Sequence, residues 1–168
     1  AVPALVESEV SGTDPWPVVE RRVAELGVVA FAERARLLDL PVGVLGETSP
    51  APPTVRTVGR RTSPGALTGL LVVDLSSMWA GPLCGRLLTR AGATVVKVES
   101  RRRPDGTRAG PTAFYDWVNS GKLSYAADFD QPGELSRLLA AADVVIESSR
   151  PAALERRGLG PAALPSRD

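Results

Sequence analysis

The sequence predicts an α/β fold, with a mostly parallel sheet and flanking helices, preceded by a small helical segment. Two observations carry this prediction. Short β-branched runs alternate with helical segments after residue 66, which is typical of strands joined by crossover helices. The chain has 168 residues, of which 43% are hydrophobic and 23% charged, as in folded globular proteins.

The first 45 residues predict the small helical segment. The stretch 14–17, Asp-Pro-Trp-Pro, is typical of a helix start, with Asp14 as a candidate cap and proline in the first turn. Hydrophobic residues then recur at helical spacing up to Gly27, and a second helix is expected over 29–39. The apolar stretch 41–45 is compatible with a short strand.

Residues 46–65 are rich in Pro, Thr, Ser, Gly and Arg, a composition that can bury little apolar surface. We expect a linker here, and therefore a domain boundary between the segments 1–45 and 66–168. The alternative is an extended arm that lies on a partner surface, because such an arm needs similar residues.

Residues 66–168 predict the sheet itself. The run 70–75 is apolar and short, which is typical of a strand buried on both faces. The expected strands are 70–75, 94–99, 123–127 and 143–147, and the expected helices are 82–90, 114–118, 132–141 and 151–157. Because strands that alternate with helices imply right-handed crossovers, this segment is expected to form a Rossmann-like unit.

Composition and charge exclude several classes of function. The net charge of +1 gives no indication of nucleic-acid binding, and no apolar run approaches the length of a membrane span. The chain has no histidine, which excludes histidine-based catalysis and histidine metal ligands within it, and we expect no metal site. Its one cysteine excludes an intrachain disulfide, and no signal peptide is recognisable, so a cytoplasmic location is expected.

The first strand-to-helix turn, 74–82, is where a dinucleotide-binding fold would carry its glycine fingerprint. No G-x-G-x-x-G is present, so NAD or FAD binding of the usual kind is not expected. Gly81 and Pro82 predict a helix N-terminus whose free N–H groups could face an anion, but an ordinary turn without a ligand has the same sequence. Asp74 is expected to cap the turn rather than to act as an acid.

Two further features are expected to be structural. Cys84 is expected on the buried side of the helix 82–90, and no histidine is present to activate it as a nucleophile. The three tryptophans are too scattered to form a stacking platform; they are Trp16, Trp79 and Trp117.

Four motifs lie in register after residue 66. In GLLVVDLSSMWAGPLCGRLLTRAGATVVKVES (69–100), a strand ends in Asp-hydrophobic-Ser, Ala-Gly-Pro and a helix follow, and a second strand ends in Lys-hydrophobic-Glu. Further matches follow at 119–122, 143–147 and 150–160. Over about 66–164 the chain therefore resembles the class III CoA-transferases of the CaiB/BaiF type. That family includes formyl-CoA and carnitine-CoA transferases and α-methylacyl-CoA racemases.

The resemblance implies a site for coenzyme A or an acyl-CoA. The residues that match CoA-contacting positions of the family are Met78, Trp79, Ser100, Arg101, Lys122, Ser148, Ser149, Ala153 and Arg156. The phosphates of CoA require fixed cations and N–H donors. Arg101, Lys122 and Arg156 are expected near the carboxyl ends of the strands, where open α/β sheets bind ligands. The neighbouring Arg102 and Arg103 are expected to be solvated.

Two departures from the family pattern bear on affinity. Family members carry Asn-Phe where this chain has Ser148-Ser149, which removes an aromatic or amide contact to adenine. Leu123 stands where the family's N-x-x-K-R-S turn has arginine, which removes one basic donor.

The resemblance further implies a transferase that moves CoA between an acyl-CoA and a carboxylic acid acceptor. In the family an aspartate attacks the thioester and forms a mixed anhydride, which is covalent catalysis by a carboxylate. That aspartate follows the next strand of the family's fold, and the chain is expected to end before it, so we assign no catalytic residue. The partner implied is a second copy in an interlocked homodimer, or the missing remainder of the protein.

Three alternatives stay open. The first is an acyl-CoA racemase or epimerase of the same family, which would need a downstream acid/base pair. The second is a catalytically inactive relative that acts as a binding or assembly module. The third is a plain Rossmann-like domain for another nucleotide, against which the missing glycine fingerprint argues.

Overall fold

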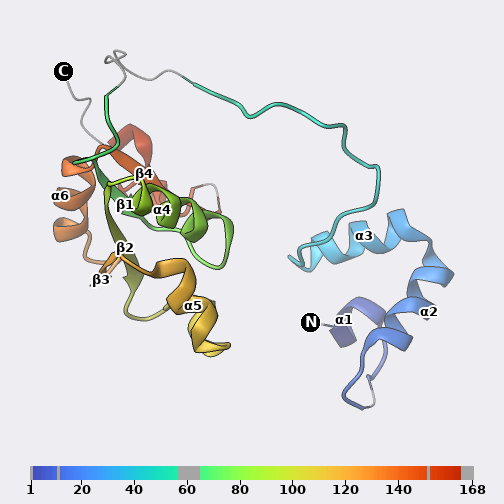
Figure 1. Cartoon of the computed structure of the whole chain (residues 1–168). Coiled ribbons are helices and arrows are strands. Elements are labelled where there is room, and N and C mark those ends of the chain that lie inside the picture. Colours follow the sequence, from blue (N-terminus) through green and yellow to red (C-terminus); the bar gives the residue numbers. More distant parts are fainter. Residues whose placement is uncertain (1, 11, 57–64, 151, 164–168) are drawn as a thin grey trace. The chain divides into compact units, whose positions relative to one another are not determined.

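The computed structural model describes residues 2–10, 12–56, 65–150 and 152–163, which fall into two compact units (Figure 1). Unit 1 comprises Ala1–Arg56 and unit 2 comprises Thr57–Asp168. Each unit has a hydrophobic core of its own. Part of the predicted linker, 57–64, lies outside the described residues.

Unit 1 is helical. It contains α1 (Val2–Val6), α2 (Trp16–Leu26) and α3 (Val28–Leu37). The two helices predicted from the sequence are therefore confirmed, and the Asp14 carboxylate accepts a hydrogen bond from Trp16 N at 3.1 Å. The strand considered for 41–45 is wrong, because these residues form no strand.

The core of unit 1 joins its three helical segments. Leu5, Phe31 and Ala35 are buried, and side chains of α2 pack against them. The Arg34 guanidinium donates hydrogen bonds to the carbonyl oxygens of Ala4 and Leu5, at 2.7 and 2.8 Å. These carbonyls end a short helix and have no helical partner of their own, so Arg34 fastens α1 to α3.

Unit 2 is built on a four-stranded, entirely parallel sheet. Its strands are β1 (Leu71–Asp74), β2 (Thr94–Ser100), β3 (Leu123–Ala127) and β4 (Val144–Ile146), in the order β3-β2-β1-β4. Leu71 pairs with Thr94, and Val72 pairs with Val144. The α/β prediction is therefore confirmed, with a helical segment before the sheet.

Helices connect and cover the strands. They are α4 (Ala80–Arg90), α5 (Thr112–Asn119) and α6 (Gly133–Ala141), with the 3-10 turns η1 (Gly106–Ala109), η2 (Glu155–Arg157) and η3 (Pro161–Ala163). The short helix predicted over 151–157 is confirmed only in its second part, as η2, while 152–154 form a turn and Pro151 lies outside the described residues. Ala152 has a positive φ of 67°, which a continuous helix from this point excludes.

The two faces of the sheet have separate cores. Val73, Val96 and Val98 pack against α6 through Leu135 and Leu139. The alternate positions of β1 and β2 pack with Leu88 of α4 on the other face. Figure 1 shows α4 and α6 on opposite sides of the strands. This double cover explains why the inner strands β1 and β2 carry consecutive apolar residues rather than alternating ones.

The strand order creates a point where the direction of winding reverses. From β1 the chain proceeds to β2 and β3 on one side, and then returns to β4 on the other side of β1. In open α/β sheets ligands bind beyond the carboxyl ends of the strands at such a point. The turns after β1 and β4 are therefore the first place to look for a site. Among the described helices, none has the length and apolar character needed to cross a membrane.

Candidate functional site

The turn after β1 is organised by a buried carboxylate. Asp74 Oδ1 accepts hydrogen bonds from both the backbone N–H, at 3.0 Å, and the hydroxyl of Ser76, and both residues are buried. The capping role predicted for Asp74 is confirmed. The turn then carries Met78 with φ 74°, a left-handed conformation that is uncommon for a side chain without a short polar group.

Helix α4 approaches this turn closely because it presents two glycines to it. A β-carbon on Gly81 would lie 2.1 Å from Ser76 Oγ, and one on Gly85 would lie 2.9 Å from Asp74 Oδ2. Glycines four residues apart occupy one face of a helix. The Ala-Gly-Pro motif and the glycine that follows it thus make room for the capped turn.

Lys122 is the second component of this cluster. Its ammonium donates to Asp74 Oδ2 and to the carbonyl of Pro82, both at 2.8 Å, and to Asn119 Oδ1 at 3.0 Å. The lysine side chain is 1% exposed. Burial lowers the pKa of Lys122, against the opposing effect of its hydrogen bond to Asp74.

Lys122 reaches the carboxyl end of β1 by a route that its sequence position does not indicate. It precedes β3 and does not follow a strand end. Because β3 begins opposite Val96, in the middle of β2, the lysine still reaches the carboxyl end of β1. The ammonium of Lys122 pairs with the buried Asp74, so it is not exposed at the surface.

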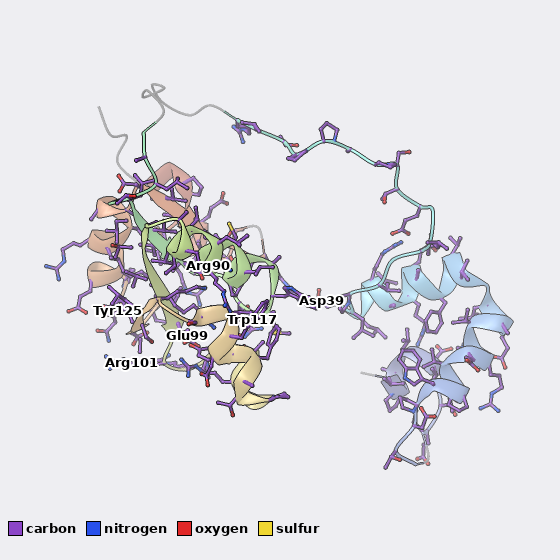
Figure 2. All side chains as sticks on the ribbon, viewed as in Figure 1. Asp39, Arg90, Glu99, Arg101, Trp117 and Tyr125 are labelled. Carbon is purple, nitrogen blue, oxygen red and sulfur yellow. The ribbon has the colours of Figure 1, made fainter. Side chains whose placement is uncertain are left out.

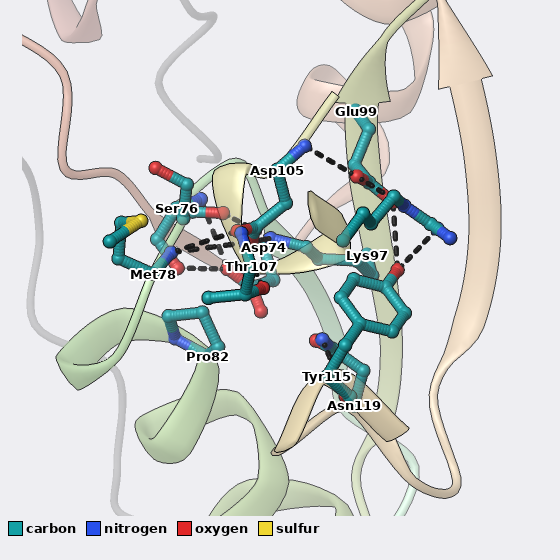
Figure 3. A network of polar contacts seen from close by, with 12 residues as sticks. Asp74, Ser76, Met78, Pro82, Lys97, Glu99, Asp105, Thr107, Tyr115 and Asn119 are labelled. Atoms are coloured by element: carbon teal, nitrogen blue, oxygen red, sulfur yellow. Dashed lines mark hydrogen bonds and ion pairs between the residues drawn. The ribbon is translucent and has the colours of Figure 1, made fainter. Parts of the chain in front are cut away.

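A second buried ion pair, Lys97 with Asp105, had no predicted role (Figure 3). Lys97 Nζ lies 3.0 Å from Asp105 Oδ2 and also donates to the carbonyl of Ser76, and both side chains are at most 2% exposed. Asp105 accepts from the backbone N–H of Met78 at 3.2 Å and from that of Thr107 at 3.0 Å. Burial raises the pKa of Asp105, but its hydrogen bonds outweigh this effect and the pKa is lowered.

Glu99 anchors the loop that carries Asp105. It accepts from Asp105 N at 2.8 Å, from Arg108 Nη2 at 2.6 Å and from the Tyr115 hydroxyl at 2.8 Å. Burial opposes ionisation of Glu99, but these donors outweigh it and lower its pKa to about 2. Burial and the hydrogen bond to Glu99 raise the pKa of Tyr115. The one sequence signal for this network is the Lys-hydrophobic-Glu ending of β2, which places Lys97 and Glu99 on it.

The predicted site residues fall into groups along the carboxyl edge of the sheet. Met78 and Trp79 follow β1 and are 57% and 65% exposed. Ser148 and Ser149 follow β4 and are exposed. The structure brings the first and last of these turns together, because Ser77 N donates to Ser148 Oγ at 3.3 Å.

The remaining predicted residues lie on either side of these turns. Ser100 ends β2 and is half-buried, and Arg101 is exposed, with its Nε 3.3 Å from the carbonyl of Ala126. Ala153 is half-buried and Arg156 is exposed. Within the described part of the chain, the Arg156 side chain makes no hydrogen bond or ion pair. Both arginines therefore have guanidinium nitrogens available to an anion.

Two shallow cavities open near this edge. One, of about 400 Å³, is lined by Lys97, Arg108, Tyr115 and Lys122 among others. The other, of about 670 Å³, is lined by Arg101 and by residues at the end of β3 and the start of α6. Figure 2 shows Arg101 and Tyr125 close together at this end of the sheet. The predicted site residues are thus spread along one edge rather than enclosed in a single pocket.

Trp79 and Trp117 are linked by Phe114, whose ring centroid lies 6.1 and 6.2 Å from theirs. These rings are edge-on or tilted rather than stacked, and Trp16 belongs to unit 1, so this arrangement does not contradict the expectation that the three tryptophans form no stacking platform. Arg86 lies over the Trp117 ring at 4.6 Å. Cys84 is exposed rather than buried, since Gly81 and Gly85 occupy the inner face of α4. Sequence separation gave no indication that α5 brings Phe114 beside the turn.

The chemistry of this edge suits a phosphorylated ligand. Exposed guanidinium groups and the N-terminus of α4 offer donors to anions. Among the described residues, no group of three or more His, Cys, Asp or Glu side chains could hold a metal ion.

Comparison with known proteins shows which family the sequence of unit 2 matches. Residues 67–168 match the model of CoA-transferase family III. The chain is 38% identical over 109 residues to a succinate–glutarate CoA-transferase of Agrobacterium fabrum, an alignment that covers 55% of this chain and 27% of that protein. It is 38% identical over 116 residues to a probable fatty acyl-CoA transferase of Mycobacterium tuberculosis, covering 61% and 29%.

Solved structures agree with the sequence comparisons. A crystal structure of the Mycobacterium tuberculosis protein Rv3272 matches with a TM-score of 0.54 at 38% identity, over 58% of this chain and 29% of that one. A CAIB/BAIF family protein from Brucella suis matches with a TM-score of 0.54 at 37% identity, over the same shares. The chain thus spans between a quarter and a third of the length of these relatives.

Proposed function

Because the chain belongs to CoA-transferase family III, we propose that unit 2 binds the nucleotide part of an acyl-CoA along the carboxyl edge of its sheet. In this proposal the chain is the CoA-binding portion of an acyl-CoA transferase. The full protein would move CoA between an acyl-CoA and a carboxylic acid. No residue of this chain is assigned as the nucleophile.

The observation that carries the proposal is the junction of two turns at the switch point of the sheet. Ser77 N donates to Ser148 Oγ, so the turns after β1 and β4 form one continuous surface. The exposed side chains of Met78 and Trp79 lie on that surface. An apolar side chain exposed beside polar backbone suits a ligand with both an adenine ring and phosphates.

Arg101 and Arg156 supply the cationic part of the proposed site. Arg101 holds one backbone carbonyl through Nε, which fixes the direction of its guanidinium and leaves both terminal nitrogens available. A fixed guanidinium binds a phosphate through two hydrogen bonds at a lower entropic cost than a mobile one. We therefore expect Arg101 to contribute more than Arg156 to binding of the CoA phosphates.

Calorimetric titration of the chain with CoA tests the proposal. We expect a dissociation constant on the order of 10 to 100 μM, weak because the chain spans only part of its relatives' length. Pantetheine, which lacks the adenosine and all the phosphates, should bind at least about tenfold more weakly than CoA if the site holds the nucleotide part. The absence of heat at millimolar CoA would reject the proposed site.

A matched pair of variants locates the phosphates. Arg101→Gln should weaken CoA binding about 5-fold or more, because a charge-assisted hydrogen bond is lost. Arg103→Gln, which removes an exposed arginine of the same loop, should leave the affinity within about 2-fold of the parent. Equal effects of the two substitutions would indicate attraction by the general charge of the loop rather than a site.

A further inference from the structure

The turn proposed to face CoA contains a backbone conformation that needs support. Met78 has φ 74°, although it is neither glycine nor a residue with a short polar side chain. Such a conformation is disfavoured for a residue with a side chain and persists only where the surroundings hold it. Met78 and Trp79 are also 57% and 65% exposed, so side-chain packing, such as that of Trp79 against Phe114, gives this conformation only limited support.

Asp105, in the loop after β2, supports the backbone conformation of Met78. Its two carboxylate oxygens lie 3.2 and 3.3 Å from the backbone nitrogen of Met78, which donates to them. The same carboxylate accepts from Thr107 N at 3.0 Å and Thr107 Oγ1 at 2.8 Å. Contacts within its own loop therefore hold the Asp105 side chain in the orientation in which it accepts from Met78 (Figure 3).

Lys97 completes the arrangement from the sheet. Its ammonium pairs with Asp105 at 3.0 Å and donates to the carbonyl of Ser76, two residues before Met78. The turn is thus held at Ser76 by a cation and at Met78 by the carboxylate that this cation neutralises. Burying such a pair brings little net stability over an apolar replacement.

We propose that Asp105, neutralised by Lys97, is a positioning residue that holds the turn after β1 so that Met78 and Trp79 face CoA; this inference rests on the function proposed above. In this role the carboxylate of Asp105 acts as a hydrogen-bond acceptor, and the ammonium of Lys97 offsets the cost of burying its charge.

Two charge-balanced double variants separate the acceptor from the ion pair. In Lys97→Met/Asp105→Asn both charges are gone, but the side-chain oxygen of the introduced asparagine still accepts from Met78 N. In Lys97→Met/Asp105→Ala the acceptor is also gone. Neither variant buries an unpaired charge, so both are expected to fold, and far-UV circular dichroism checks this. The two variants differ in the side-chain acceptor at position 105, which serves both Met78 and Thr107.

Two measurements follow the turn. Met78 is the only methionine of the chain, so its amide and methyl signals are assigned without ambiguity by NMR. We expect the Met78 amide to exchange with solvent about 10-fold or more faster in the alanine variant than in the asparagine variant, because it has lost its acceptor. CoA should bind the asparagine variant within about 3-fold of the parent and the alanine variant about 10-fold more weakly.

The outcomes distinguish this inference from the function on which it rests. If the parent chain binds no CoA, the proposed function fails, and the exchange of the Met78 amide still tests whether Asp105 holds the turn. If the parent binds CoA and both variants bind it equally well, the positioning role is wrong. Equal amide exchange in the two variants would also overturn it.

Discussion

The ammonium group of Lys122 lies among Asp74, Pro82 and Asn119 rather than at the surface. Its sequence motif correctly placed it near the carboxyl end of β1, but did not indicate its partners. The partners of Lys122 depend on the register of β3, which begins opposite the middle of β2. No local pattern in the sequence predicts where two distant strands start to pair. For Lys122 the sequence therefore predicted the end of the sheet near which the residue lies, but not the groups that its ammonium contacts.

Replacing Lys122 by methionine should destabilise unit 2 strongly. The substitution leaves the Asp74 carboxylate, which is fully buried, without its cation, and breaking a buried pair in this way costs about 3 to 5 kcal/mol. Urea denaturation measures the loss. Arg103→Met removes an exposed cation with a similar change of shape and should cost less than about 0.5 kcal/mol. A loss below about 1 kcal/mol for Lys122→Met would contradict the buried pair.

Glu99 gives the protein a stability that depends on pH. Its pKa is about 2 in the folded protein, below the usual value of 4.5. Its contribution is therefore complete above pH 4.5 and is lost as the pH falls toward 2. The difference in melting temperature between the parent and Glu99→Gln should shrink over this interval. A difference that stays constant from about pH 5 to about pH 2 would show that the carboxylate is not held in its charged form.

At the scale of elements, the strands and helices of unit 2 followed their periodicity. The inner strands β1 and β2 carry consecutive apolar residues that helices bury on both faces, which is a strong local signal. The predicted helix over 151–157 is shortened to η2, and Ala152 takes a left-handed conformation that nothing in its identity indicates. The aromatic group on α5 and the turn was missed because it depends on packing between elements.

The close approach of α4 to the turn predicts the effect of a single methyl group. Gly81→Ala would place a β-carbon 2.1 Å from Ser76 Oγ and 2.2 Å from Ser76 Cβ, so the helix must shift. We expect a loss of about 2 to 4 kcal/mol in the free energy of unfolding. Gly133→Ala, at the start of α6 where nothing lies within 4 Å, should be neutral or slightly stabilising. Similar losses in both variants would argue against the contact.

At the scale of the whole molecule, the chain consists of two units with separate cores. Composition alone pointed to a low-complexity stretch between them, because residues that cannot bury apolar surface are easily recognised. What composition could not indicate is how loops from different strands meet, as Asp105 and Met78 do. Such contacts arise from topology and involve residues far apart in sequence.

Limited proteolysis should separate the two units. Residues 48–56 are exposed and contain no helix or strand, so trypsin is expected to cleave after Arg56 before it cleaves within either unit. Mass spectrometry identifies the fragments, and circular dichroism of the larger one should retain the α/β signal. First cleavage at the exposed arginines 101–103 would instead indicate that the loop after β2 opens more readily than this stretch.

The outward position of Cys84 has a practical consequence. It is the one thiol of the chain, and it lies on the open side of a helix that starts at the turn proposed to face CoA. A maleimide dye attached there would sit near the ligand without entering the glycine-lined contact on the opposite side of the helix. Fluorescence from that single label could then follow ligand arrival in real time, in a protein whose own tryptophans are divided between two units.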